Sequence, residues 1–196
     1  MKITAEKDAL IQAFARAIEA AGGKALLVGG IVRDQLLGLS SKDYDFEVFG
    51  LPLENVQQIL SRFGNVKQVG QSFGVLHIQE LDWDVALPRR ERKTGEGHRG
   101  FDVIPDPSMT IEEAARRRDL TINAMSKDPL TGEIIDPLGG LQDLQNKILR
   151  AADPSTFGED PLRALRIAQF AARFDFDVEP NTLQIVAAQP LEELPG

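Results

Sequence analysis

The stretch from Leu27 to Gly50, LVGGIVRDQLLGLSSKDYDFEVFG, constrains the fold of this chain more than any other. It contains an apolar run, a glycine pair, a short amphipathic segment and a second apolar run. These predict a strand ending at Val28, a turn at Gly29-Gly30, a helix over 31–37 and a strand over 43–49. Strands and helices that alternate this closely predict a sheet with helices packed on it.

The glycine pair is a candidate anion site. Without a Cβ, Gly29 and Gly30 let backbone amides approach a phosphate, and the N-terminus of the following helix favours negative charge. A glycine pair is also the ordinary signature of a turn, so the pair alone does not identify a ligand.

A second candidate site is the D-x-D pattern formed by Asp43 and Asp45. Side chains at i and i+2 of a strand share a face roughly 6–7 Å apart. Carboxylates at that spacing suit Mg²⁺, which prefers oxygen ligands and commonly bridges to substrate phosphates. A solvated strand face is the alternative, whereas a calcium loop is excluded because Val48 stands where that loop needs glycine. Together the two candidate sites indicate a nucleotide-using enzyme.

Composition removes several function classes. The chain has 196 residues and no cysteine, which excludes disulfides, thiolate catalysis and zinc–thiolate sites. No apolar run reaches the ~18–20 residues that span a bilayer, and the N-terminus lacks the apolar core of a signal peptide, so we expect a cytoplasmic protein without membrane partners. The formal net charge of −8 argues against broad, sequence-independent affinity for nucleic acid.

Hydrophobic periodicity predicts further elements on both sides of the opening stretch. They are helices over 4–21 and 53–63 and strands over 66–69, 73–79 and 81–87, with the last two joined by a hairpin around residues 80–82. We therefore expect a mixed sheet with helices over one face. On its last strand either Asp82 or Asp84 could complete a site of three carboxylates, unless this is only a polar outer face.

The segment 88–107 shows no clean period, so we interpret it as a long mobile loop. His98 lies in this loop and His77 in the preceding strand. Two histidines so scattered are interpreted as structural rather than catalytic.

A helix is predicted to begin at Thr110 and to carry Asp119 and Asn123 on one face. At that spacing the two side chains can hydrogen-bond to each other or to a ribose hydroxyl. The glycines and prolines of residues 136–140 then mark a domain boundary, with one domain over 1–138 and a helical one over 139–196.

The helix after Phe157 carries a charged stripe. Pro161 suits its first position and makes Asp160 the N-cap, and Arg163 and Arg166 follow at steps of three. A capped amphipathic helix explains this pattern. The alternative is recognition of a base, because a carboxylate accepts from an exocyclic amino group while a guanidinium donates to a ring nitrogen. Such a pair accepts cytosine and adenine and rejects uracil and guanine.

These motifs together resemble the class II tRNA nucleotidyltransferases (CCA-adding enzymes) and the related bacterial poly(A) polymerases. The matching segments occur in family order over roughly residues 25–176. They are VGGIVRDQLLG with KDYDFEV, WDVALPRRERKTGEGHRGF, RRRDLTINAM, DPLGGLQDLQNKILR and GEDPLRALRIAQFAARF. The resemblance implies an α+β fold: a DNA polymerase β-like nucleotidyltransferase head with a mixed sheet and helices, followed by an all-helical neck.

The resemblance also implies roles for individual residues. Asp43, Asp45 and Asp84 match Mg²⁺ ligands, with Asp84 preferred over Asp82. The positions that match nucleotide contacts are Gly29, Gly30 and Arg33 near the triphosphate, Arg118, Asp119 and Asn123 near the ribose, and Asp160, Arg163 and Arg166 near the base. The segment 89–100 matches a flexible loop thought to help switch specificity between C and A.

The implied reaction is transfer of a nucleoside monophosphate from CTP or ATP to an RNA 3′ end, expected to be a tRNA, with two Mg²⁺ ions. Two departures from the family stand out. Gln169 replaces a further arginine, and relatives continue into helical body and tail domains that grip the tRNA. A poly(A) polymerase and a non-catalytic module that binds RNA or nucleotide remain open as alternatives.

Overall fold

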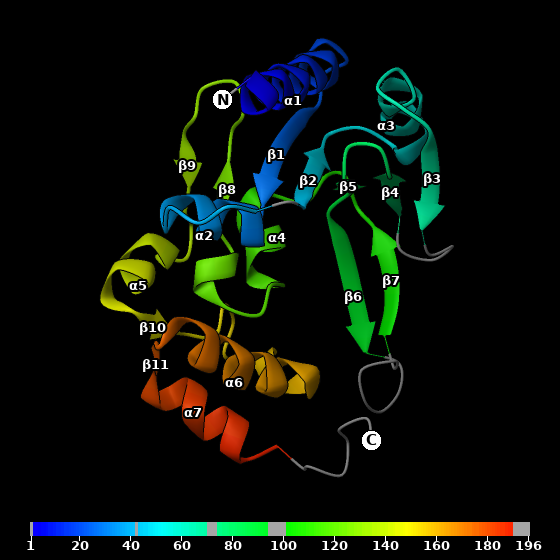
Figure 1. The fold of residues 1–196 in the computed structure, drawn as a ribbon. Coiled ribbons are helices and arrows are strands. Elements are labelled where there is room, and N and C mark those ends of the chain that lie inside the picture. Colours follow the sequence, from blue (N-terminus) through cyan, green and yellow to red (C-terminus); the bar gives the residue numbers. More distant parts are fainter. Residues whose placement is uncertain (1, 42, 70–73, 94–100, 190–196) are drawn as a thin grey trace. The chain divides into compact units, whose positions relative to one another are not determined.

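The computed structural model describes residues 2–41, 43–69, 74–93 and 101–189. The chain forms two compact units that interleave along the sequence (Figure 1). Unit 1 comprises Met1–Arg90, Ile104–Thr110 and Ser126–Ile135, and unit 2 comprises Glu91–Val103, Ile111–Met125 and Asp136–Gly196. These units are defined by contacts and do not follow a single boundary along the chain. The division into a head over 1–138 and a neck over 139–196 stays a prediction about family domains.

A seven-stranded mixed sheet forms the centre of unit 1, with the strand order β3-β4-β5-β2-β1-β8-β9. The strands are β1 (Lys24–Val28), β2 (Tyr44–Phe49), β3 (Val66–Val69), β4 (Val75–Ile78), β5 (Trp83–Ala86), β8 (Ser126–Lys127) and β9 (Ile134–Ile135). β2 and β5 run parallel, whereas the other neighbouring pairs are antiparallel. The predicted mixed sheet is confirmed, including the hairpin of β4 and β5.

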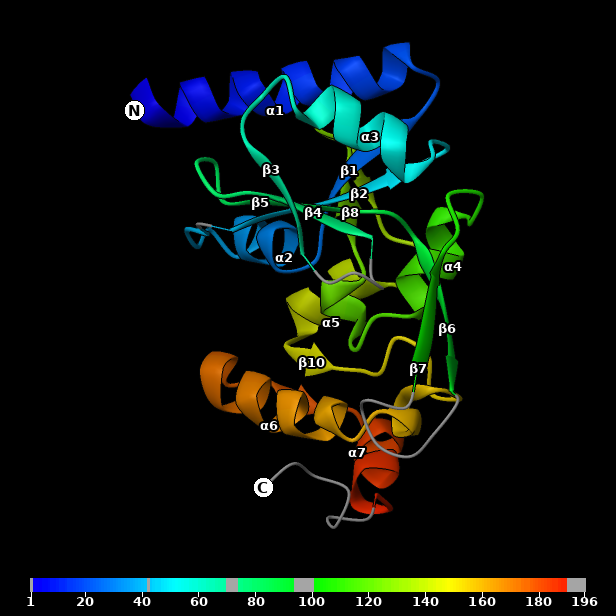
Figure 2. The same ribbon diagram turned by 90° about the vertical axis from the view of Figure 1, so that its right-hand side faces the viewer.

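Helices cover both faces of this sheet. α1 (Lys2–Ala20) and α3 (Leu53–Leu60) lie over one face, and α2 (Gly30–Leu36) lies on the other (Figure 2). On the first face the ring of Phe14 packs against Phe46 and Trp83, with centroid distances of 5.3 and 5.7 Å. The prediction of helices over one face is therefore right for α1 and α3 and wrong for α2, whose Ile31 and Val32 are buried against the opposite side.

The segment predicted as a long loop contains a two-stranded sheet of β6 (Arg89–Lys93) and β7 (Phe101–Pro105). The prediction is wrong for these two stretches, while His98 lies outside the described residues. Where the sheet begins, Arg90 Nε donates to Asp106 Oδ2 at 2.7 Å, and Asp106 N–H donates to Pro88 O at 2.7 Å. Hydrogen bonds from the Ser108 hydroxyl and from Arg90 hold the pKa of Asp106 below its usual range.

Unit 2 is mostly helical. Its helices are α4 (Ile111–Arg116), η1 (Thr121–Asn123), α5 (Gly140–Asn146), η2 (Phe157–Glu159), α6 (Leu162–Phe174) and α7 (Pro180–Ala187). One short parallel pair joins β10 (Ile148–Leu149) and β11 (Asp177–Val178), in addition to the predicted helices.

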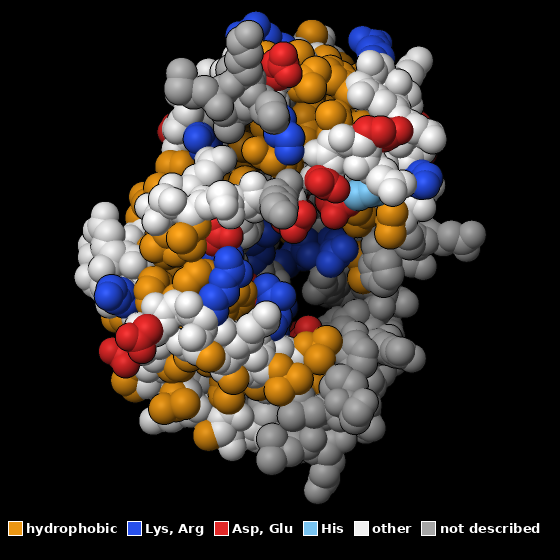
Figure 3. Space-filling view, in the orientation of Figure 1, with side chains coloured by type: hydrophobic (Ala, Val, Ile, Leu, Met, Phe, Trp, Pro, Cys, Tyr) orange, Lys and Arg blue, Asp and Glu red, His pale blue; other side chains and the backbone are white. Residues whose placement is uncertain are grey.

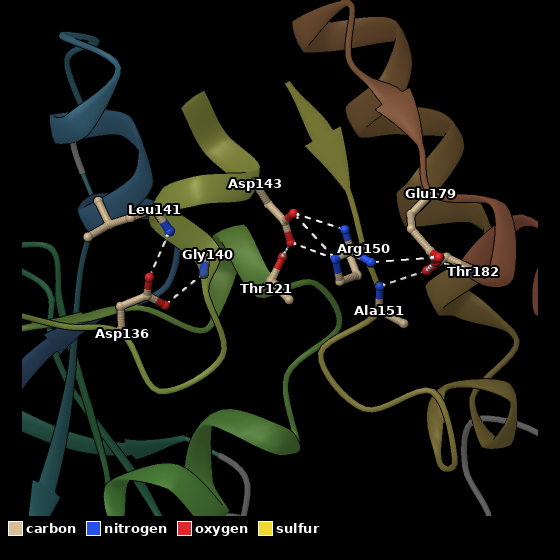
Figure 4. Close-up of polar contacts among 9 residues, drawn as sticks. All are labelled: Thr121, Asp136, Gly140, Leu141, Asp143, Arg150, Ala151, Glu179 and Thr182. Carbon is tan, nitrogen blue, oxygen red and sulfur yellow. Dashed lines mark hydrogen bonds and ion pairs between the residues drawn. The ribbon is translucent and has the colours of Figure 1, made fainter. Parts of the chain in front are cut away.

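A network of polar contacts connects η1, α5, β10 and α7 within unit 2 (Figure 4). Asp143 is buried and accepts from Thr121 Oγ1 at 2.7 Å and from Arg150 Nε at 3.0 Å. Glu179 accepts from the backbone N–H and the hydroxyl of Thr182, each at 2.8 Å, and the Thr182 hydroxyl oxygen accepts from Ala151 N–H. The network holds η1, α5, β10 and α7 together within unit 2.

In the part of the chain that the structure describes, no helix combines the length and the apolar character needed to cross a bilayer.

Candidate functional site

Two of the predicted metal-binding carboxylates lie side by side on neighbouring strands. β2 and β5 are parallel and in a register that pairs Asp45 with Asp84. Directly paired residues point to the same face of a sheet, and Asp43 lies immediately before β2, two residues from Asp45. Asp43 and Asp84 are exposed and Asp45 is half-buried. The backbone therefore brings the three residues to one end of two adjacent strands.

Of the two aspartates that the sequence left open, Asp84 is the one on β5. Asp82 lies in the turn before the strand, in a left-handed conformation with φ of 51°, and its carbonyl accepts from Tyr44 N–H. Asp82 has no position in the ladder beside β2, whereas Asp84 does. This geometry supports Asp84 as the third carboxylate.

The donor set suits a hard divalent cation, because all three side chains offer carboxylate oxygens. Among the described residues, no three His, Cys, Asp or Glu side chains are close enough to surround an ion by themselves. Mg²⁺ usually takes only one or two carboxylates from a protein and completes its coordination with waters and substrate phosphates. The residues therefore fit Mg²⁺ in the presence of a nucleotide, and their role as ligands stays a prediction.

Asp84 has a neighbour that the sequence interpretation missed. His77 on β4 is paired in register with Asp84, and its Nδ1 lies 2.7 Å from Asp84 Oδ1. Figure 3 shows a histidine beside acidic side chains on this side of the molecule. The sequence signal was the hairpin itself. The predicted hairpin, around residues 80–82, has its centre at residue 81. A centre between residues 80 and 81 would have paired residue 77 with residue 84.

The glycine turn takes the conformation that the sequence predicts. Gly29 has φ of 73° and ψ of −133°, a region essentially restricted to glycine, and it forms the N-cap of α2. Gly30 begins the helix, and a Cβ there would lie 3.4 Å from a terminal nitrogen of Arg33. Arg33 is buried, and its guanidinium contacts Asp34 Oδ1 at 2.7 and 2.8 Å. Contact of Gly29, Gly30 and Arg33 with a triphosphate stays a prediction.

In unit 2, Asp119 is the centre of a hydrogen-bonded group. It is buried, and its Oδ1 accepts from Leu120 N–H at 2.8 Å and from Asn123 Nδ2 at 3.0 Å. Its Oδ2 accepts from Arg166 Nε at 2.6 Å. The hydrogen bond between Asp119 and Asn123 is one of the two alternatives that the sequence left open, but the helix that was expected to create it is absent: α4 ends at Arg116, and Asn123 belongs to η1. Arg118 lies between these elements and is partly buried.

The other two base-reading candidates lie at the start of α6. Asp160 has extended backbone angles, and its Oδ1 accepts from Leu162 N–H at 3.0 Å, as predicted for an N-cap, although α6 begins at Leu162 and Pro161, with helical backbone angles, is the residue directly before it. Arg163 donates to Arg117 O at 3.0 Å and to Thr156 O at 3.4 Å. Unit 2 thus brings Asp119 into contact with Asn123 and Arg166, and it places Arg163 on the first turn of α6 and Asp160 just before that helix.

One protein-family model and one similar protein each match most of this chain. The model of the family described as poly A polymerase head domain matches residues 25–150. The multifunctional CCA protein of Nitrosomonas europaea is 46% identical over 159 residues, which are 81% of this chain and 37% of that protein.

Solved structures of tRNA nucleotidyltransferases and CCA-adding enzymes are also similar to this chain. A tRNA nucleotidyltransferase complexed with a primer tRNA and an incoming ATP analogue is 34% identical, with a TM-score of 0.71 over 88% of this chain and 48% of that one. The CCA-adding enzyme of Bacillus stearothermophilus in complex with CTP is 30% identical, with a TM-score of 0.73 over 88% of this chain and 41% of that one. The chain therefore spans less than half the length of these relatives.

Proposed function

The chain belongs to the class II tRNA nucleotidyltransferase family, and from that premise we propose that it transfers nucleotides from CTP or ATP to an RNA 3′ end, with tRNA as the expected acceptor. The observation that carries the proposal is the register that sets Asp45 beside Asp84 on parallel strands, with Asp43 immediately before the first residue of β2. Relatives whose structures contain CTP, or a primer tRNA and an ATP analogue, support the choice of substrates.

In the proposed reaction the RNA 3′ oxygen forms a bond to the α-phosphorus of the incoming nucleotide. The bond from that phosphorus to the bridging oxygen of the β-phosphate breaks, pyrophosphate leaves, and the hydroxyl proton passes to solvent. Asp43, Asp45 and Asp84 would hold two Mg²⁺ ions. When bound, Mg²⁺ lowers the pKa of the attacking hydroxyl and neutralises charge on the leaving group. The chain needs no histidine as acid or base, because phosphoryl transfer depends mainly on positioning and charge stabilisation.

Selection of the nucleotide is the proposed task of unit 2. The carboxylate of Asp160 has one oxygen occupied by Leu162 N–H, and the other can accept from the amino group of cytosine or adenine. Arg163, on the same helix turn, can donate to the adjacent ring nitrogen. Asp119, held by Asn123 and Arg166, is the candidate contact for a ribose hydroxyl.

The test is incorporation of radiolabelled CTP and ATP by the 196-residue chain into three RNA acceptors, namely tRNAs ending before CCA, after C and after CC. We expect incorporation that requires Mg²⁺ and falls at least about a hundredfold in Asp45→Asn, since charge stabilisation of this kind is commonly worth that much. Undiminished incorporation by Asp43→Ala and Asp45→Ala would refute the metal assignment.

Poly(A) polymerisation is the second candidate, because the matching family model is described by that activity. Here ATP addition would continue past one residue on the acceptor that ends after CC, whereas a CCA-adding reaction would stop. Binding of CTP and ATP without any incorporation would instead favour a non-catalytic module.

A further inference from the structure

Three neighbouring strands of the unit 1 sheet place polar residues in one row. His77 on β4 pairs with Asp84 on β5, and Asp84 pairs with Asp45 on β2. Residues that are directly paired point to the same face, so all three side chains lie on the face opposite Phe46 and Trp83, which pack against α1. The row ends in two of the carboxylates proposed to bind metal.

The contact inside this row is short and directional. His77 Nδ1 lies 2.7 Å from Asp84 Oδ1. An ionised carboxylate can only accept, so Nδ1–H of the imidazole is the donor. The second oxygen of Asp84, Oδ2, takes no part in this hydrogen bond and is available to a cation.

The side chains of Asp84 and His77 differ in how much of their surface is exposed to solvent. The Asp84 side chain has 51% of its surface exposed and that of His77 only 28%. An exposed aspartate on a strand can populate several χ1 rotamers, and a cation must select the one that faces it. The hydrogen bond from the less exposed imidazole restricts Asp84 to one orientation before a cation arrives.

We propose that His77 is a positioning residue, which orients Asp84 by the Nδ1–H hydrogen bond and so raises the affinity of the carboxylate site for a divalent cation. This inference rests on the proposed function, because it assumes that Asp84 is a metal ligand. Hydrogen-bonding partners of metal ligands typically contribute 10–100-fold in metal affinity. His77 itself is not the ligand in this scheme, because Mg²⁺ prefers oxygen and the Nδ1 atom already faces Asp84.

Substitutions of His77 can test the roles of its ring nitrogens Nδ1 and Nε2 separately. In His77→Asn the side-chain N–H₂ group is attached to Cγ, as Nδ1 is, so it keeps a donor toward Asp84. In His77→Gln the polar group moves out to the Nε2 position, and His77→Leu removes it. We would measure Mn²⁺ affinity of the full chain in the presence of a non-hydrolysable CTP analogue, relative to the analogue alone, from the electron paramagnetic resonance signal of free Mn²⁺, and Mg²⁺ affinity by displacement, both without RNA.

We expect His77→Gln and His77→Leu to weaken Mn²⁺ binding by about tenfold or more, and His77→Asn to stay within about threefold of the native chain. If His77 were purely structural, its replacement would lower the melting temperature, and His77→Asn and His77→Gln would bind Mn²⁺ equally well. Circular dichroism melts of all variants therefore accompany the titrations. If Nε2 were a direct ligand of Mn²⁺, Gln would bind better than Asn, which would overturn the proposal.

Two further variants distinguish failure of the inference from failure of the proposed function. If Asp45→Asn and Asp84→Asn weaken Mn²⁺ binding but His77→Gln and His77→Leu do not, the role of His77 is refuted and the metal site stands. If neither aspartate variant changes the affinity, or the native chain binds no Mn²⁺, both the metal site and the inference that rests on it are refuted.

Discussion

Arg166 Nε donates to Asp119 Oδ2 at 2.6 Å and thereby ties α6 to the segment that follows α4. The two residues are 47 positions apart in sequence and differ in exposure, with 50% of the Arg166 side chain and 9% of the Asp119 side chain accessible. The other oxygen of Asp119 accepts from Leu120 N–H and from Asn123. Every donor around this carboxylate would lose its acceptor if the oxygens were replaced.

We expect Asp119→Asn to lower the free energy of unfolding by about 1–3 kcal/mol, because an amide nitrogen would face one of these donors in a buried position. Arg166→Ala should cost only about 0–1 kcal/mol, since its side chain is half exposed and water can replace it. Urea unfolding followed by circular dichroism measures both. Equal losses in the two variants would contradict the assignment of Asp119 as the centre of the group.

Gly140 is a position where only glycine fits. An added Cβ would meet Thr121 O at 2.2 Å and Met125 Cγ at 3.0 Å, so Gly140→Ala must displace backbone. We expect a loss of about 3 kcal/mol or more in the free energy of unfolding. Gly158→Ala is the matched control, because its Cβ would meet only ordinary contacts at 3.6 Å and should change stability by no more than about 0.5 kcal/mol. A Gly140→Ala chain as stable as the control would contradict this packing.

Asp143 provides a test of the network in unit 2. Its side chain is 7% exposed and accepts from Thr121 and Arg150. Replacing it by Asn leaves a buried amide nitrogen against donors, so we expect Asp143→Asn to lower the free energy of unfolding by about 1–3 kcal/mol. Asn146→Ala, at an exposed position on the same helix, should stay within about 0.5 kcal/mol of the native chain. Denaturant titration of the two variants side by side gives the comparison.

Periodicity predicted the elements of unit 1 well, because burial there follows the pattern of the sequence. In α1 the residues Ile11, Phe14, Ala15 and Ile18 recur at helical spacing and are all buried. Hydrophobic periodicity did not predict the sheet of β6 and β7. Ile104 on β7 is 62% exposed, so this sheet does not show the alternation by which a half-buried strand is recognised.

The sequence named candidate site residues, but it did not predict the contacts that these residues make in the structure. Continuing the helix from Thr110 through Asn123 was wrong because tertiary hydrogen bonds interrupt it: Leu120 forms a bridge with Ala151, and Thr121 N–H donates to Arg150 O. Such long-range pairing is invisible to local propensity. Whether Asp84 contacts His77 depends on the register of the hairpin. A shift of one residue in that register would pair Asp84 with a different residue.

Acid should destabilise the chain through groups whose pKa is lowered in the folded state. Burial acts to raise the pKa of Glu179, but hydrogen bonds from Thr182 outweigh it and leave the pKa below its ordinary value of 4.5. The Ser155 hydroxyl lowers the pKa of Asp153 from 3.8. A lowered folded pKa means that the folded state binds protons less readily, so this stability is present above the ordinary pKa and is lost as pH falls through the folded value.

The variant Glu179→Gln isolates one of these groups, because it keeps a carbonyl acceptor for Thr182 but does not titrate. We expect it to be less stable than the native chain near neutral pH, and we expect this difference to shrink as the pH falls below 4.5 toward about 3, because the native carboxylate then takes up protons. Urea titrations of both chains at about pH 7 and about pH 3 measure the difference. A difference that is the same at both values would show that Glu179 does not contribute through its charge.

Asp160 has two tasks that substitution can separate. Its Oδ1 accepts from Leu162 N–H at the start of α6, and its carboxylate is proposed to read the base of the incoming nucleotide. Asparagine caps a helix as well as aspartate does, whereas alanine costs about 1 kcal/mol at such a position. Asp160→Asn therefore keeps the helix start and changes only what is offered to a base.

We expect Asp160→Asn to reverse part of the nucleotide preference. Its amide nitrogen would donate where the carboxylate accepted, which opposes the amino groups of cytosine and adenine and suits the carbonyl groups of uracil and guanine. The change in preference for CTP and ATP over UTP and GTP should be worth about 1–3 kcal/mol, measured by competition among the four nucleotides for binding to the chain. Asp160→Ala should lose the preference without reversing it and should also melt at a lower temperature. If Asp160→Asn and Asp160→Ala both keep the native preference, the base is read elsewhere, and the carboxylate serves only to cap α6.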